Sequence, residues 1–100
     1  MNLHLVKLVT IVCEAYAQDA VTKLLREIGA HGWTSFAVEG DGSQGQRPAD
    51  IREFANVQIE VIVPPDVAIA LLERLERDFF PRYGMIAFES DVRVVRPDKF

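Results

Sequence analysis

Cysteine is almost absent from this sequence, and so are long apolar runs. Cys13 is the single cysteine, so no intrachain disulfide can form, which fits a reducing compartment. The apolar runs fall far short of the ~20 residues that a membrane-spanning helix needs. Asn2, His4 and Lys7 interrupt the N-terminal apolar residues, which argues against a signal peptide. We therefore expect a soluble cytoplasmic protein.

A surplus of basic residues is missing too. The chain has 11 Lys and Arg residues against 15 Asp and Glu residues, for a formal net charge of -4. Because nucleic-acid binding needs a basic surface, this charge argues against a nucleic-acid partner. The sequence also lacks a catalytic set of histidine, carboxylate and nucleophile, a metal-ligand cluster and a P-loop motif. We expect a protein that is not an enzyme and holds no metal or catalytic cofactor.

The sequence instead alternates strand-like and helix-like segments within 100 residues, a length that suits one domain. The β-prone runs cover residues 5–13, 33–39, 57–63 and 86–95, and apolar residues recur at helical spacing over 17–28 and 67–79. Gly29 suits a helix end and Pro65 a helix start. The order β-α-β-β-α-β predicts an α+β, ferredoxin-like fold with a four-stranded antiparallel sheet and two helices on one face.

The predicted strands have apolar residues at most positions rather than at every second one. Residues 5–13 in particular read as a central strand that is buried on both faces. The sheet face away from the helices therefore needs a cover, and self-association supplies one. We expect an oligomer.

Residues 40–54 hold the densest run of polar, glycine and proline residues. Gly40, Gly42 and Gly45 let the backbone turn tightly and approach a ligand closely. Successive N–H groups in such a turn can bind an anion. A loop of this length in a small domain is usually functional, so the segment predicts a site for an anionic small molecule.

Five segments, in this order and spacing, resemble the PII signal-transduction superfamily; they are residues 7–12, 29–34, 40–44, 57–64 and 79–86. The resemblance covers nearly the whole chain. It is stronger to the PII-like branch linked to bicarbonate uptake and carboxysomes than to the nitrogen regulators. It implies a single PII-like domain over residues 1–100, assembled as a homotrimer with an adenine nucleotide in the clefts between subunits. The family's T-loop corresponds to residues 41–55, and residues 97–100 form a C-terminal tail.

By position, the resemblance implies nucleotide contacts at Thr34, Gly40, Gly42, Ser43, Gln44, Ile62, Arg82, Tyr83, Gly84, Met85 and Arg96. Thr34 and Ile62 would lie near the adenine and ribose. Residues 42–44 would meet the phosphates at the T-loop base, and residues 82–85 would form a second loop on the phosphate side. Arg96 would reach the phosphates from the neighbouring subunit.

The departures from the nitrogen regulators bear on the ligand. Those proteins carry cations where this chain has Ser43, Asn56 and Met85. Losing them removes charge-assisted hydrogen bonds that ATP or 2-oxoglutarate needs, so ADP or AMP is favoured. Gln44 and Arg47 are candidates for binding bicarbonate beside the nucleotide.

The resulting hypothesis is a regulatory protein that binds ADP or AMP, together with bicarbonate, and signals inorganic carbon and energy status through its T-loop. Its partner would be a protein such as a bicarbonate transporter or a carboxysome component. Two alternatives stay open: a nitrogen-type regulator that binds ATP and 2-oxoglutarate, and an ACT-like regulatory domain. An acylphosphatase-type enzyme is disfavoured because residues 13–16 read Cys-Glu-Ala-Tyr, without the arginine that its phosphate loop needs.

Overall fold

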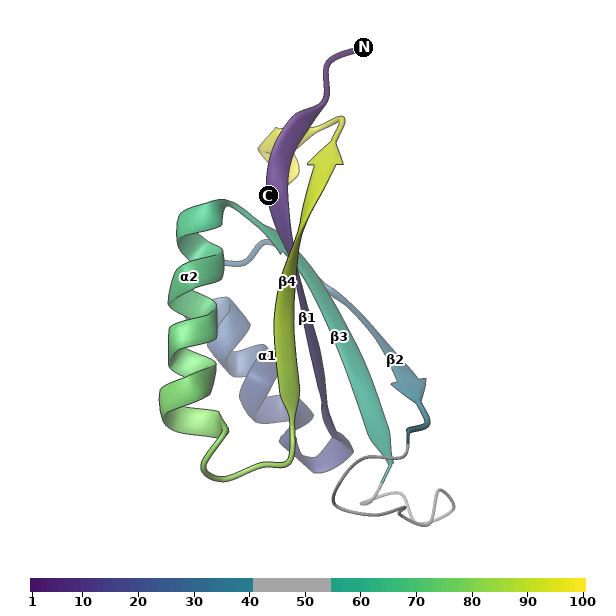
Figure 1. Ribbon diagram of the computed structural model, residues 1–100, viewed down its shortest axis with the longest axis vertical. Coiled ribbons are helices and arrows are strands. Elements are labelled where there is room, and N and C mark those ends of the chain that lie inside the picture. Colours follow the sequence, from purple (N-terminus) through teal and green to yellow (C-terminus); the bar gives the residue numbers. More distant parts are fainter. Residues whose placement is uncertain (41–54) are drawn as a thin grey trace.

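The computed structural model describes residues 1–40 and 55–100 (Figure 1). The elements follow in the order β1 (His4–Glu14), the 3-10 turn η1 (Ala15–Ala17), α1 (Gln18–Glu27), β2 (Thr34–Val38), β3 (Asn56–Val63), α2 (Pro65–Arg74), the π-helical turn η3 (Leu75–Phe79), β4 (Ile86–Val94) and the 3-10 turn η4 (Pro97–Lys99). The predicted order of four strands and two helices is therefore confirmed.

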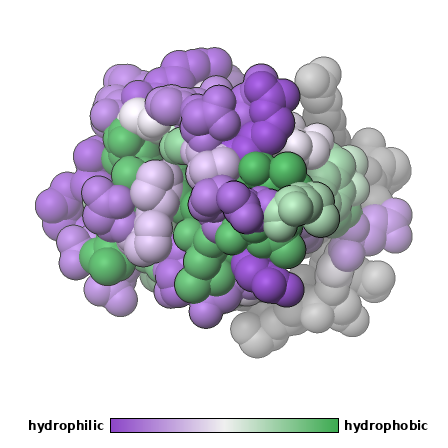
Figure 2. All heavy atoms as spheres, turned by 90° about the horizontal axis from the view of Figure 1, so that it is seen from above, coloured by the Kyte–Doolittle hydropathy of each residue, from purple (hydrophilic) through white to green (hydrophobic). Residues whose placement is uncertain are grey.

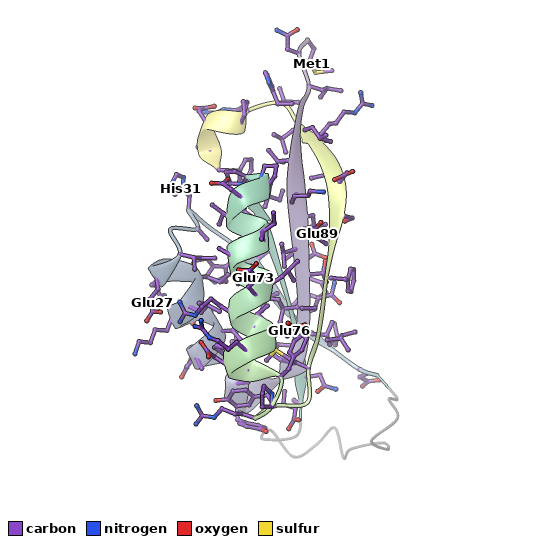
Figure 3. The ribbon with its side chains drawn as sticks, turned by 60° about the vertical axis from the view of Figure 1, so that its left-hand side comes forward. Met1, Glu27, His31, Glu73, Glu76 and Glu89 are labelled. Carbon is purple, nitrogen blue, oxygen red and sulfur yellow. The ribbon has the colours of Figure 1, made fainter. Side chains whose placement is uncertain are left out.

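The four strands form one sheet in the order β2-β3-β1-β4, and every pairing in it is antiparallel. β1 is an inner strand, as predicted. Its residue Ile11 pairs with Ile59 of β3 on one side and with Ala87 of β4 on the other. Both helices lie against the same face of the sheet (Figures 1 and 3). The architecture is the expected α+β, ferredoxin-like one.

The hydrophobic core lies between this sheet face and the two helices. Successive strand residues point to opposite faces, so every second residue of β1 and β3 enters the core. The fully buried side chains include Val9, Ile11, Ile59 and Val61 from the sheet and Leu24, Leu25, Leu71 and Leu75 from the helical side. The β-branched residues suit the strands and the leucines suit the helices.

The ends of both helices follow from single residues. After α1, Gly29 has φ of 85°. The Gly29 N–H donates to Arg26 O at 3.1 Å and the Ala30 N–H to Leu25 O at 2.9 Å, the paired bonds of a Schellman cap. Pro65 begins α2; the first N–H groups of a helix have no acceptor within it, so the missing N–H of proline costs no helical hydrogen bond there. Both sequence-based helix boundaries are confirmed.

The opposite face of the sheet, which we call the open face, has no helix against it. Phe36 of β2 and Ile86 and Phe88 of β4 are 42%, 59% and 51% exposed there. On this face of β1, Val6 and Thr10 are buried, at 7% and 4% exposure, whereas Leu8 and Val12 are half-buried. The prediction that β1 is buried on both faces therefore holds for part of its length. Hydrophobic groups also reach the surface at the upper end of the molecule (Figure 2), where Met1, Leu5 and Val95 are exposed.

Some predicted boundaries are wrong by one or more residues. β2 covers Thr34–Val38 instead of residues 33–39, since its pairing with β3 begins at Thr34 and ends at Val38. The second helix is not α-helical to its end, since Leu75–Phe79 form a π turn in which the Phe80 N–H donates to Leu75 O at 2.9 Å. Part of the predicted tail forms η4. Of the predicted T-loop at 41–55, all but Ala55 lies outside the described residues.

Candidate functional site

The first group of predicted site residues lies along the edge that β2 and β3 form. Thr34 begins β2 and pairs with Glu60 of β3, which in turn pairs with Thr10 of β1. Ile62 lies two residues beyond Glu60 and so points to the same open face. The structure therefore places Thr34 and Ile62 as diagonal neighbours on one face.

Glu60 is a residue at this edge that the sequence reasoning left without a role. Its half-buried carboxylate accepts a hydrogen bond from Gln58 Nε2 at 3.0 Å. The register with β2 stops at Glu60, so the backbone of β3 beyond it is not paired with β2. The sequence does contain one signal for Glu60: the alternation over residues 57–63 puts it on the same face as Ile62, which was a predicted ligand residue. This edge combines a carboxylate, a hydroxyl, unpaired strand backbone and an apolar side chain.

A second group, residues 82–85, connects η3 to β4. The Arg82 and Tyr83 N–H groups both donate to Phe79 O at 2.9 Å, which fixes the turn to the end of the π-helical segment. Tyr83 and Met85 are half-buried and pack against the core, whereas Arg82 and Gly84 are exposed. The exposed guanidinium of Arg82 and the backbone at Gly84 are the groups of this turn that a ligand can reach.

A third position, Gly40, lies two residues after the end of β2. The pair between Val38 and Asn56 holds the two chain segments beside one another there. Ala55 directly precedes β3, and its carbonyl oxygen accepts a hydrogen bond from the Ala15 N–H at 2.7 Å. The start of β3 therefore meets the end of β1 at the lower end of the sheet, and the end of β2 lies on the other side of β3 (Figure 1). The predicted ligand residues Gly42, Ser43, Gln44 and Arg47 lie outside the described residues.

Arg96 lies near the other end of the molecule. Val94 is paired with His4 of β1, and Ile62 is paired with Leu8 of the same strand. These two rows of paired residues are four positions apart along β1. At ~3.3 Å per residue, these rows are about 13 Å apart, and Arg96 follows two residues further on. β2 and β4 are also opposite edges of the sheet. One chain thus does not bring Arg96 to Thr34, or residues 82–85 to the β2–β3 edge.

Several other cations are already paired with carboxylates. Lys7 Nζ lies 2.5 Å from Asp91 Oδ1 and 3.4 Å from Glu89 Oε1, and these partners raise the pKa of Lys7. Glu89 lies on β4 (Figure 3). Arg74 bridges Glu27 and Asp78 at 3.3 and 3.1 Å. Among the described residues, neither Arg82 nor Arg96 has an ion-pair partner, so both can bind an anion.

The described residues offer little reactive chemistry. Burial and the neighbouring charge of Glu14 raise the pKa of Cys13 to about 11, which keeps the thiol protonated and unreactive at neutral pH. In residues 1–40 and 55–100, no group of three or more His, Cys, Asp or Glu residues could hold a metal ion. None of the helices in these ranges combines the length and apolar character that a membrane crossing requires.

Comparison with known proteins gives a consistent result. The family model of nitrogen regulatory protein P-II matches residues 6–99. The chain is 39% identical to a PII-like signaling protein from Thermus thermophilus, with a TM-score of 0.88 and coverage of 100% of this chain and 99% of that one. Among curated proteins, no significant match is found.

Structures of the PII-like protein CPII from Thiomonas intermedia are also similar. One, bound to ADP, AMP and bicarbonate, is 29% identical with a TM-score of 0.91, and covers 99% of this chain and 96% of that one. Another, bound to ADP and bicarbonate, is 30% identical with a TM-score of 0.90, covering 99% and 97%. The resemblance to the PII-like proteins is confirmed. This chain belongs to the nitrogen regulatory protein P-II family, whose members regulate rather than catalyse, and it is a PII-like regulatory protein.

Proposed function

We propose that this protein senses ADP or AMP together with bicarbonate, in clefts between the subunits of a homotrimer. The observation that carries the proposal is that three groups able to bind a ligand lie far apart within one chain. The β2–β3 edge, the turn at residues 82–85 and Arg96 lie apart, so a single ligand can contact all three only where chains adjoin. The CPII structures that hold ADP and bicarbonate support this choice of ligand.

The β2–β3 edge suits the nucleoside half of the ligand. Ile62 gives an apolar surface for a base, and the strand backbone beyond the last β2 pair can hydrogen-bond a base edge. The Glu60 carboxylate can accept hydrogen bonds from ribose hydroxyls, and charge assistance makes such bonds strong. Thr34 adds a hydroxyl next to Glu60.

The turn at residues 82–85 suits the phosphate half. Arg82 supplies a guanidinium that has no carboxylate partner among the described residues. Met85 is half-buried against the core and carries no charge. Asn56 is also neutral, whereas nitrogen regulators have a lysine at that position. Fewer cations favour AMP and ADP over ATP, and Arg96 from a neighbouring subunit adds one more.

The open face supports the trimer. Phe36 and Ile86 lie in one row across the sheet, together with half-buried Val12, and Phe88 lies in the next row. Exposed aromatic and aliphatic groups in neighbouring rows are typical of an interface, and burying them in a closed assembly removes them from water.

In this function, the nucleotide and bicarbonate change what a protein partner contacts, and the partner is a bicarbonate transporter or a carboxysome component in the cytoplasm. Gln44 and Arg47 are the proposed bicarbonate ligands. The two ligands would shift the equilibrium between the free and the partner-bound protein only if they bind these two forms with different affinity. No bond of the nucleotide is broken.

Isothermal titration calorimetry tests the proposal directly. ADP and AMP are titrated with and without bicarbonate, and ATP with 2-oxoglutarate is the comparison. We expect ADP or AMP to bind, and bicarbonate to tighten that binding. Binding of ATP with 2-oxoglutarate alone would instead indicate a nitrogen-type regulator, and a dimer without nucleotide affinity would indicate an ACT-like role.

A pair of variants locates the site. Glu60→Gln removes the charge from the β2–β3 edge, and Glu73→Gln makes the same change on an exposed position of α2 (Figure 3). A hydrogen bond to a charged group contributes about 1.5–3 kcal/mol, so Glu60→Gln should weaken ADP binding roughly tenfold or more. Equal affinity in both variants would place the nucleotide elsewhere.

A further inference from the structure

Three aromatic side chains form a row at the lower end of the molecule, beside the turn at residues 82–85. The ring of Tyr83 lies between those of Phe79 and Tyr16, with centroid distances of 5.7 Å to Phe79 and 5.6 Å to Tyr16. The interplanar angles are 37° and 52°, so both contacts are tilted and within the favourable range for aromatic pairs. Tyr16 and Tyr83 are the chain's two tyrosines.

One end of this row is fixed in the core. Phe79 is 8% exposed and ends the π turn, and its carbonyl oxygen accepts the N–H groups of both Arg82 and Tyr83. Single π turns inside α-helices occur frequently at functional sites. Here the chain that follows is the turn at residues 82–85.

The other end of the row belongs to a different segment. Tyr16 lies in η1, directly after β1, and the residue is 56% exposed although its ring contacts that of Tyr83. Its backbone is held on both sides: Ala17 is fully buried, and the Ala15 N–H donates to Ala55 O at 2.7 Å. Tyr16 therefore connects the end of β1 and the start of β3 to the turn that carries Arg82.

We infer that Tyr16 is a positioning residue for the phosphate side of the nucleotide site. Its ring holds Tyr83, and with it the backbone of residues 82–85, at a set distance from the lower end of β1 and β3. This inference rests on the proposed function and deepens it. Tyr16 acts through Tyr83 and contacts no part of the adenosine moiety, so its effect depends on the presence of phosphate groups in the ligand.

The test compares Tyr16→Ala, Tyr16→Phe and the control Ile69→Ala, which truncates an exposed side chain on α2. Each protein is titrated calorimetrically with adenosine, AMP and ADP. Loss of one aromatic pair corresponds to a roughly two- to tenfold change in affinity. We expect Tyr16→Ala to weaken AMP and ADP binding by this factor and to leave adenosine binding unchanged, while Tyr16→Phe and Ile69→Ala behave as wild type.

The outcomes separate the two claims. If the wild-type protein binds no nucleotide, the proposed function fails. If it binds ADP and Tyr16→Ala binds ADP equally well, or loses adenosine affinity to the same extent, only the role of Tyr16 is overturned. A Tyr16→Phe variant as weak as Tyr16→Ala would also overturn it, because the ring would then not be the active group.

A spectroscopic measurement covers the case in which Tyr16→Ala does not fold. Ring-labelled tyrosine gives signals from Tyr16 and Tyr83, which Tyr16→Phe assigns. On the inference, ADP shifts the signals of both rings in the wild-type protein and adenosine shifts neither. A Tyr16 signal that does not respond to saturating ADP would overturn the inference without any truncated variant.

Discussion

Replacing Phe88 by serine should dissociate the proposed trimer. Phe88 lies on the open face and is 51% exposed in the single chain. A phenylalanine side chain has roughly 200 Å² of surface, so about 100 Å² remains to be buried by a neighbour. At ~25 cal/mol per Å², this is about 2.5 kcal/mol per subunit and roughly 7 kcal/mol for the three copies.

This free energy sets the size of the expected shift. Roughly 7 kcal/mol is about five powers of ten in the trimer dissociation constant. Because that constant has units of concentration squared, the concentration at which half the trimer dissociates should rise about 300-fold. Sedimentation velocity over a dilution series measures this concentration directly.

Ile69→Ser is the matched control, since Ile69 is 58% exposed but lies on α2, on the helix side of the molecule. Circular dichroism of each variant confirms that its fold is retained. A wild-type protein that is monomeric at all concentrations would refute the reasoning, and so would equal midpoints for Phe88→Ser and Ile69→Ser.

Three further predictions concern single side chains. Hydrogen bonds from Arg77 and Arg74 lower the pKa of Asp78 from 3.8 to about 2. The Asp78→Asn variant should therefore be less stable than the wild type above pH 4, and this difference should shrink as the pH falls through 2 and disappear below it; a pH-independent difference in urea unfolding would contradict this. Cys13, with a pKa of about 11, should not react with a disulfide reagent at pH 8 until the protein is unfolded in urea; rapid reaction of the native protein would contradict its burial. Leu71→Ala should lower the free energy of unfolding by about 2–5 kcal/mol, and Ile69→Ala by far less.

The fold could be predicted largely from local signals. Strict alternation at residues 57–63, the cap at Gly29 and the start at Pro65 each follow from backbone geometry that those residues impose themselves. The π turn at Leu75–Phe79 could not be predicted, because it depends on how Phe79 reaches the core. A helical pattern of apolar residues is compatible with either geometry.

The candidate site was less predictable, because its parts depend on register and on contacts between distant segments. Glu60 acquires a role only once β3 is paired with Thr34 on one side and Thr10 on the other. Tyr16 matters only because η1 lies beside Tyr83, 67 positions later in the chain. No periodicity or motif in the sequence encodes either contact.

The arrangement of the site links ligand binding to assembly. If the nucleotide is held between chains, it binds the trimer and not the monomer, and mass action then stabilises the trimer as nucleotide is added. At a nucleotide concentration 100 times its Kd, each site should contribute about 2.7 kcal/mol to trimer stability. Three sites give roughly 8 kcal/mol, enough to offset the loss expected for Phe88→Ser. Saturating ADP should therefore restore the Phe88→Ser trimer in sedimentation experiments and adenosine should restore it less, whereas a dissociation midpoint that ignores ADP would mean that the site lies within one chain.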